Sequence, residues 1–207
     1  MMSRSFSFRR NHAALRGLLR RLRREQRGIA AIEFGIVAPV MLIAYFGLVG
    51  VTQAVMIHRK VGQLTRTLAD LSTQSTTLTD TNVGNIFDAA KAVMMPFTDV
   101  TPHMSIASVV VNGSGVAKVC WSDARNSTAL TVDSTISLPS TLAVPNTSLI
   151  LATASYDFTL QHDFPLKETP ITIGGSTIYM RPRMGQTGGA SGAEQVGRVK
   201  SSSTTLC

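Results

Sequence analysis

The pattern of hydrophobic and polar positions has its longest apolar stretch near the start of the chain. From Phe34 to Val51, eighteen consecutive residues carry no formal charge, and the helix-compatible stretch covers residues 29–57. A helix rises about 1.5 Å per residue, so roughly 20 residues cross about 30 Å of hydrocarbon. The pattern therefore predicts a transmembrane helix over residues 29–57.

A helical pattern continues beyond this stretch but becomes amphipathic. Residues 58–71 keep apolar side chains at three-four spacing, which predicts a stalk that extends the same helix. The apolar positions of the stalk are Val61, Leu64, Leu68 and Leu71. After a hydroxyl-rich break at residues 72–82, residues 83–94 show the same spacing and stop before Pro96. We expect a second amphipathic helix there, with its apolar face in a core.

The second half of the chain changes to the two-residue period of strands. Residues 104–111 and 115–121 flank the turn signal "NGSG", which predicts a β-hairpin. Residues 149–160 alternate between apolar and polar side chains, so one face is expected in a core and the other in water. A further short strand is expected within 130–138, and a second hairpin is expected to turn at Gly174–Gly175.

Helices first and strands afterwards indicate an α+β fold. We expect a long N-terminal transmembrane helix that continues as an amphipathic stalk, followed by a small, mostly antiparallel β-sheet. The predicted segments are a basic leader (1–28), the transmembrane helix (29–57), the stalk and second helix (58–97), a β-rich exported body (98–183) and a flexible tail (184–207).

The formal net charge of +8 is concentrated in the leader. Residues 1–28 hold nine arginines and Glu25, whereas residues 29–207 hold eleven basic and eleven acidic residues. No basic patch interleaved with aromatic residues follows, so we expect no nucleic-acid partner. Basic residues before a span keep that side in the cytoplasm, which predicts an exported body. The residues assigned to this orientation are Arg20, Arg21, Arg23, Arg24 and Arg27.

Glu33 is the one carboxylate inside the apolar stretch. An ionisable side chain there costs about 2.5 to 3.5 kcal/mol on insertion scales and is functional by default. Cleavage between Gly28 and Ile29 would create an α-amine with a pKa of about 7.7 to 8.0, and hence a cationic partner. Within one helix the two groups are poorly directed for an ion pair. The amine of an axially staggered neighbouring copy would meet the carboxylate better.

Two other interpretations fit the apolar stretch. It could be an uncleaved signal anchor, or a secretory signal cut after Ala54 that releases a soluble protein beginning at Val55. A cleavable signal has an apolar region of about 7 to 15 residues, which is shorter than this stretch. Neither interpretation supplies a partner for Glu33.

The residues around Gly28 resemble a known class of signal. Gly28, four apolar residues, Glu33–Phe34 and a long apolar helix resemble the class III signal of type IV prepilins. The wider run "RGIAAIEFGIVAPVMLIAYFGLVGV" resembles the TadE/TadG-like pseudopilins of tight-adherence (Tad) pilus systems. The resemblance implies that prepilin peptidase cuts after Gly28, that Ile29 is the mature N-terminus and that Glu33 serves processing or assembly. Pro39 matches a proline common in this helix and is expected to kink it.

This resemblance implies a pilus assembly protein that crosses the bacterial inner membrane once, with the N-terminus cytoplasmic and the body periplasmic. Phe34 stands where the major Flp pilins have tyrosine, which favours a minor pseudopilin. The implied partners are the membrane, prepilin peptidase, other pilins or pseudopilins and the Tad assembly machinery. The alternative is an uncleaved, signal-anchored binding module or adhesin that presents the same body outside the membrane.

Candidate chemistry is sparse. Cys120 and Cys207 could form a disulfide in an exported body, or Cys120 could be an ordinary buried thiol. The four histidines, at positions 12, 58, 103 and 162, show no metal-ligand spacing with another His, Cys or carboxylate. The sequence also contains no nucleophile elbow, phosphate loop or zinc-binding helix. We therefore expect no enzymatic activity, no cofactor and no metal.

Overall fold

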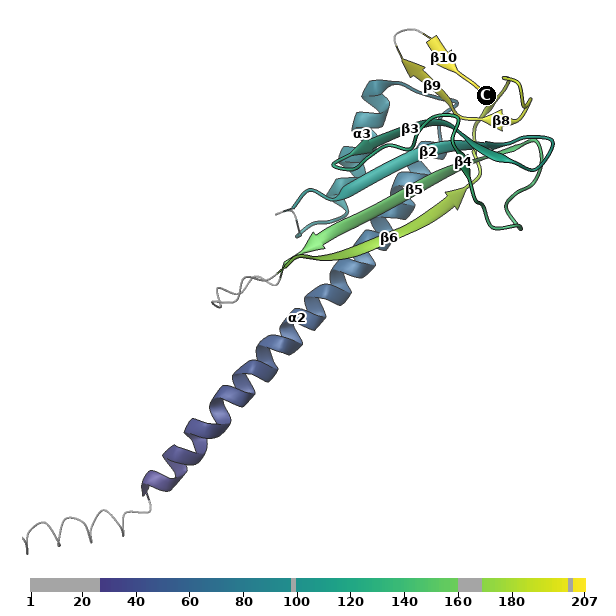
Figure 1. Ribbon diagram of the computed structural model, residues 1–207. Coiled ribbons are helices and arrows are strands. Elements are labelled where there is room, and N and C mark those ends of the chain that lie inside the picture. Colours follow the sequence, from purple (N-terminus) through teal and green to yellow (C-terminus); the bar gives the residue numbers. More distant parts are fainter. Residues whose placement is uncertain (1–26, 98–99, 160–168, 201–202) are drawn as a thin grey trace, which may run out of the picture. The chain divides into compact units, whose positions relative to one another are not determined.

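The computed structural model describes residues 27–97, 100–159, 169–200 and 203–207. The chain divides at Val51–Thr52 into two compact units, which are described separately. Its longest element is helix α2 (Arg27–Thr73), whose first part belongs to the first unit and whose remainder belongs to the second (Figure 1). The helix continues through Pro39 without a break.

The second unit is built on a five-stranded antiparallel sheet. Its strand order is β4-β3-β2-β5-β6, and all neighbouring pairs are antiparallel (Figure 1). The strands are β2 (His103–Val111), β3 (Ala117–Arg125), β4 (Thr135–Ile136), β5 (Thr147–Phe158) and β6 (Ile171–Met180). The predicted hairpin at "NGSG" is confirmed by the β2–β3 pair, and the α+β class is confirmed as a whole.

Helix α3 (Asp80–Ala92) and the last part of α2 supply the helical side of the main core. Thr79 caps α3, because its hydroxyl accepts a hydrogen bond from the Asn82 N–H at 3.2 Å. The apolar faces of both helices join the apolar face of the sheet in one buried cluster. Its members include Ile57, Val61, Leu64 and Leu68 of α2, Val83, Ile86, Phe87 and Ala90 of α3, and Ile150, Ala152, Ala154, Tyr156 and Phe158 of β5.

The alternation in β5 predicts that the opposite face of the sheet is exposed to water, but part of this face is buried. Leu149 and Leu151 of β5 point to this face and form a second buried cluster with residues of β2 and β3. Leu138 and Leu142, from the connection between β4 and β5, pack against it. On this face the side chains are partly exposed only from Thr153 onward, so the expected contact with water holds for the second half of β5.

The predicted hairpin at Gly174–Gly175 is wrong, because β6 is one strand that pairs with β5 along most of its length. The two glycines form an irregularity within the pairing, at φ of 109° and 89°. A Cβ on Gly174 would lie 2.6 Å from Val61 Cγ1 and 2.7 Å from the Ala154 carbonyl oxygen. Glycine is therefore needed for close approach of the strand to α2 and β5 rather than for a chain reversal.

The predicted flexible tail at residues 184–207 is also wrong. It contributes β7 (Gln186–Thr187), β8 (Glu194–Gln195), β9 (Gly197–Lys200) and β10 (Ser203–Thr205). Strand β9 pairs in parallel with β1 (Thr77–Leu78) and antiparallel with β10, while β7 pairs with β8. Val196 is fully buried in the main core. Strand pairing, burial of Val196 and a disulfide at Cys207 thus tie the described part of this Gly/Ser-rich segment to the body.

Candidate assembly helix

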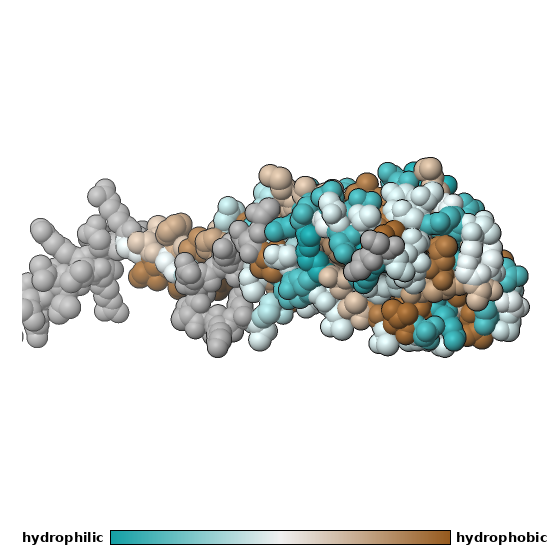
Figure 2. Space-filling model, turned by 90° about the horizontal axis from the view of Figure 1, so that it is seen from above, coloured by the Kyte–Doolittle hydropathy of each residue, from teal (hydrophilic) through white to brown (hydrophobic). Residues whose placement is uncertain are grey.

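The part of α2 between Ile29 and Val51 exposes apolar side chains on all sides. Phe34 is 73% exposed, and neighbouring isoleucines, valines and leucines are also largely exposed. Among the described residues, α2 is the one helix whose length and apolar composition would let it cross a membrane. Figure 2 shows this part of α2 in brown and tan wherever grey atoms do not cover it. A helix that is apolar all round is typical of a membrane span or of the core of a large protein.

Glu33 is exposed on this helix. None of the ion pairs among the described residues includes it. The basic residues of α2 nearest to Glu33 in sequence are Arg27, six residues before it, and Arg59, 26 residues after it. Glu33 therefore lies among exposed apolar side chains of α2.

The predicted cleavage position lies at the beginning of α2. Gly28 and Ile29 are both helical and exposed, and no atom would lie within 4 Å of a Cβ on Gly28. Ile29 precedes Glu33 by four residues, a rise of about 6 Å. The structure thus places the two residues about one helical turn apart.

Two further predicted residues lie on the same segment. Pro39 is inside the helix, and the predicted kink stays a prediction. Of the orientation arginines, Arg27 is the first residue of α2, whereas Arg20, Arg21, Arg23 and Arg24 lie outside the described residues.

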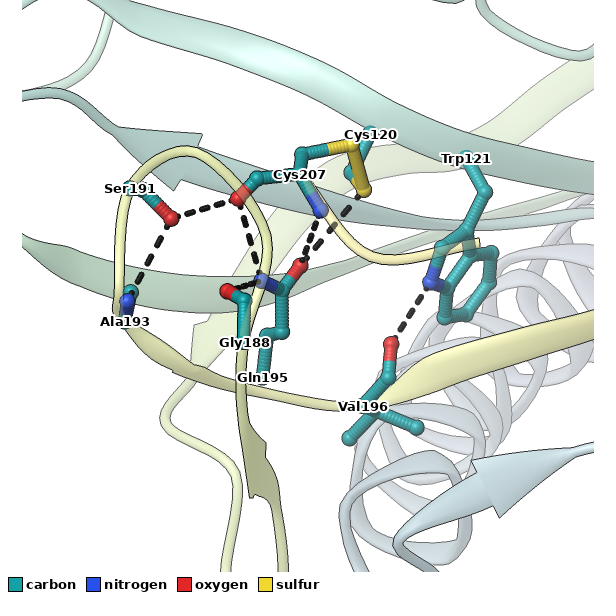
Figure 3. The surroundings of a disulfide bond; sticks show 8 residues. All are labelled: Cys120, Trp121, Gly188, Ser191, Ala193, Gln195, Val196 and Cys207. Atoms are coloured by element: carbon teal, nitrogen blue, oxygen red, sulfur yellow. Dashed lines mark hydrogen bonds between the residues drawn. A yellow bond between two sulfur atoms is a disulfide. The ribbon is translucent and has the colours of Figure 1, made fainter. Parts of the chain in front are cut away.

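The structure joins Cys120 and Cys207 in a disulfide, so of the two alternatives Cys120 is not a free thiol (Figure 3). Cys120 reaches its partner because β3 has an irregularity at this point. Trp121 is opposite Ser108 of β2 and Val119 is opposite Val109, which leaves Cys120 as the extra residue of a bulge. Cys120 and Trp121 thus both join the main core.

Hydrogen bonds fix the segment around Cys207. The Gln195 side chain accepts from the Cys207 N–H at 3.0 Å and donates to the Cys207 carbonyl oxygen at 3.2 Å. The Ser191 hydroxyl donates to the same oxygen at 2.6 Å, and the Trp121 indole N–H donates to the Val196 carbonyl at 2.8 Å. Figure 3 shows these groups converging around the disulfide.

Arg198 is the most unusual side chain of this region, because it is charged and only 2% exposed. Its guanidinium donates to both carboxylate oxygens of Asp123, at 2.6 and 3.1 Å, and to Asp80. It also donates to the Leu78 carbonyl at 3.0 Å. Arg198 therefore ties β9 to β3, β1 and the first turn of α3. The sequence analysis did not identify Arg198. The valines at 196 and 199 could have indicated a strand at this position.

Two of the four histidines, His58 and His103, belong to the described residues, whereas His12 and His162 lie outside them. No group of three His, Cys, Asp or Glu side chains among the described residues is arranged to hold a metal ion. His103 instead pairs with Asp157 at 3.0 Å and donates from its other ring nitrogen to the Asn126 carbonyl. These contacts, first of all the hydrogen bond to Asp157, raise the pKa of His103. Hydrogen bonds from Thr172 and then His103 lower the pKa of Asp157.

Comparison with known families singles out the same helix. Residues 28–70 match the family model described as TadE-like protein, which confirms the TadE/TadG-like resemblance over this segment. The match relates the chain to Tad pilus systems and covers most of α2 but not the β-rich body. No curated protein and no solved structure matches the chain.

Proposed function

We propose that this protein is a minor pseudopilin that assists assembly of a Tad-type pilus. It crosses the inner membrane once through the N-terminal part of α2, with its N-terminus in the cytoplasm and its body in the periplasm. Prepilin peptidase cuts between Gly28 and Ile29. The role requires packing against other pilins or pseudopilins and the assembly machinery, and no chemistry on a substrate.

One observation carries this proposal. The first part of the segment that matches the TadE-like family, residues 29–51, exposes apolar side chains all round, and Glu33 lies among them in none of the described ion pairs. A lone carboxylate in hydrocarbon is costly, so an intermolecular cation makes association of helices more favourable than isolation. The α-amine that cleavage exposes on Ile29 of a neighbouring helix is such a cation.

Replacement of Glu33 tests the proposal. Glu33→Gln keeps the shape of the side chain and removes its charge, so the protein should insert and its body should fold while pilus formation is lost. Membrane fractionation and the buried Trp121 fluorescence serve as controls for insertion and folding. Glu33→Asp keeps the charge and should retain part of the pilus formation. Normal pili in Glu33→Gln would contradict the assembly role of the carboxylate.

A further inference from the structure

The face of the five-stranded sheet opposite the helices carries a groove next to the second buried cluster. Ser105 of β2, Thr153 of β5 and Thr177 of β6 are opposite one another in the strand pairing, so their side chains form a row across three strands (Figure 1). Together with residues that follow β3 along the chain, this row lines a cavity of about 530 Å³. Binding sites for small ligands have volumes of about 300 to 1,000 Å³. We call the cavity the Tyr179 groove and define it by Ser105, Leu130, Ile136, Thr153, Thr177 and Tyr179.

Hydrogen bonds fix the part of the groove that follows β3. The Leu130 N–H donates to the Ser122 hydroxyl at 3.0 Å, and the Ser134 carbonyl accepts from the Val119 N–H at 3.0 Å. Strand β4 comes next and pairs with the first residues of β3. Residues 130–136 are therefore bound to β3 as part of the folded body. A site that is already formed loses less conformational entropy when it binds a ligand.

The hydroxyl groups of the Tyr179 groove can form further hydrogen bonds. Thr153 and Thr177 share one hydrogen bond of 3.0 Å, which leaves one of their two protons available. The hydroxyls of Ser105, Thr135 and Tyr179 bond to no other described residue, although all three residues line the groove. A hydroxyl donates one hydrogen bond and accepts up to two. The groove therefore presents several donors and acceptors close together.

The rest of the lining determines the chemical class of the ligand. None of the described residues that line the groove carries a charge, so an ionised ligand would lose hydration without gaining a counter-charge. Leu130, Ile136 and Leu151 give the groove an apolar part, and the Tyr179 side chain packs against the second buried cluster. A suitable ligand is therefore uncharged and has apolar surfaces as well as many hydroxyl groups.

A sugar ring has this combination of surfaces. Its C–H groups form apolar faces that pack on aromatic and aliphatic side chains, while its hydroxyls project from the rim and form hydrogen bonds. Tyrosine suits such a ligand because an apolar ring and a polar hydroxyl occur in one side chain. An extended peptide, by contrast, pairs with backbone groups at a sheet edge, and the row from Ser105 to Thr177 lies on the face of the sheet. The lining thus favours a saccharide over a peptide strand.

We propose that the Tyr179 groove binds a neutral saccharide chain. The Tyr179 ring packs against the C–H face of one sugar, and the row of Ser105, Thr153 and Thr177 forms hydrogen bonds with sugar hydroxyls. In the exported body of the proposed function, the two sources of such a chain are the N-acetylated glycan of the cell wall and a secreted glucan. The groove lies within the second unit, so its ligand does not depend on Glu33 or on pilus formation.

Titration of the full chain with oligosaccharides tests the proposal. The protein is purified in lauryldimethylamine oxide, because detergents with sugar headgroups would compete for the groove. Chitohexaose represents the N-acetylated glycan, whereas cellohexaose and maltohexaose represent glucans, so the tighter ligand identifies the source. Isothermal titration calorimetry should give a Kd of about 1 mM or lower with at least one of the three. Absence of saturable binding with all three would overturn the proposal.

Variants of two exposed threonines show whether the ligand occupies the groove. Thr177→Val removes a hydroxyl of the row and should weaken binding about two- to ten-fold. The matched control is Thr205→Val, because Thr205 is also an exposed strand residue but does not line the groove. Its Kd should equal that of the wild type, and equal Kd values for the two variants would overturn the proposal. Both variants should keep the wild-type urea midpoint of Trp121 fluorescence.

Tyr179 provides a second test at the same site. Tyr179→Ala removes the ring and should weaken binding about ten-fold or more, and an unchanged Kd would overturn the proposal. A photo-crosslinking amino acid in place of Thr177 that yields a protein adduct in cells, and no glycan adduct, would overturn it in favour of a neighbouring protein. Glu33→Gln should bind the oligosaccharide with the wild-type Kd, so failure of this proposal and failure of the proposed function can be distinguished.

Discussion

Composition and burial are related in opposite ways in two regions of the molecule. These regions are the first part of α2 and the C-terminal segment, residues 185–200 and 203–207. Residues 29–51 are rich in large apolar side chains, yet these remain exposed. The C-terminal segment is rich in Gly, Ser and Thr, yet Gln195, Val196 and Arg198 are buried. The comparison shows that apolar content alone does not decide which segment joins the core. An apolar helix can be kept for a membrane, and a polar segment can be fixed by specific bonds.

Reduction of the disulfide should have the largest effect on this comparison. Cys120 and Cys207 are 87 residues apart, and a loop of that size stabilises a fold by about 4 to 5 kcal/mol in the chain-entropy model. We expect a matching loss of free energy of unfolding with dithiothreitol, measured by urea titration in mild detergent. Trp121 is the only tryptophan and reports on this region. Cys207→Ser should be equally destabilised and insensitive to the reductant, and a wild type that ignores the reductant would contradict the prediction.

Removal of the buried cation should be nearly as costly. Arg198→Met leaves Asp123, whose side chain is 16% exposed, without its main partner, and breaking such a pair costs about 3 to 5 kcal/mol. Lys200→Met is the matched control, because Lys200 lies 3.6 Å from the same carboxylate but is 56% exposed. Its loss should change the free energy of unfolding by less than about 1 kcal/mol. Similar losses in both variants would show that Arg198 does not fix the segment.

Two leucines of the same helix sharpen the contrast between a core and an exposed apolar surface. Leu64 is fully buried in the main core and Leu48 is 68% exposed. Leu64→Ala should lower the free energy of unfolding of the body by about 2 to 5 kcal/mol, because it leaves a cavity. Leu48→Ala should leave the urea midpoint of Trp121 fluorescence unchanged. A shift in the Leu48 variant would mean that this part of α2 stabilises the body after all.

The smallest expected effect is a dependence on pH. The raised pKa of His103 means that its pairing with Asp157 stabilises the fold fully below about pH 6.5, and this contribution is lost as pH rises through the folded-state pKa. The lowered pKa of Asp157 means that its contribution to stability is fully present above about pH 4 and is lost as the pH falls further. Both side chains are about one-third exposed, so the loss between pH 6 and 8.5 should stay below about 1 kcal/mol. His103→Gln should reduce this dependence, and an unchanged pH profile would exclude His103 as its source.

The sequence was informative wherever a periodic pattern coincided with burial. Three-four spacing located both helices, and alternation located β5, because these segments bury apolar faces. The C-terminal segment was missed because its stabilising groups act through contacts distant in sequence. Arg198 reaches Asp80 and Asp123, and Gln195 holds Cys207, which no local pattern encodes. The hairpin predicted at the glycine pair 174–175 was wrong for a related reason, because Gly174 is required by its close approach to Val61, which is distant in sequence.

The most direct test of the proposed function is the mass of the native protein extracted from cell membranes. Intact-mass analysis with N-terminal sequencing should find a chain that begins at Ile29, as expected if prepilin peptidase exposes the amine that Glu33 needs. A membrane-bound chain that still carries residues 1–28 would contradict the account and favour an uncleaved anchored module.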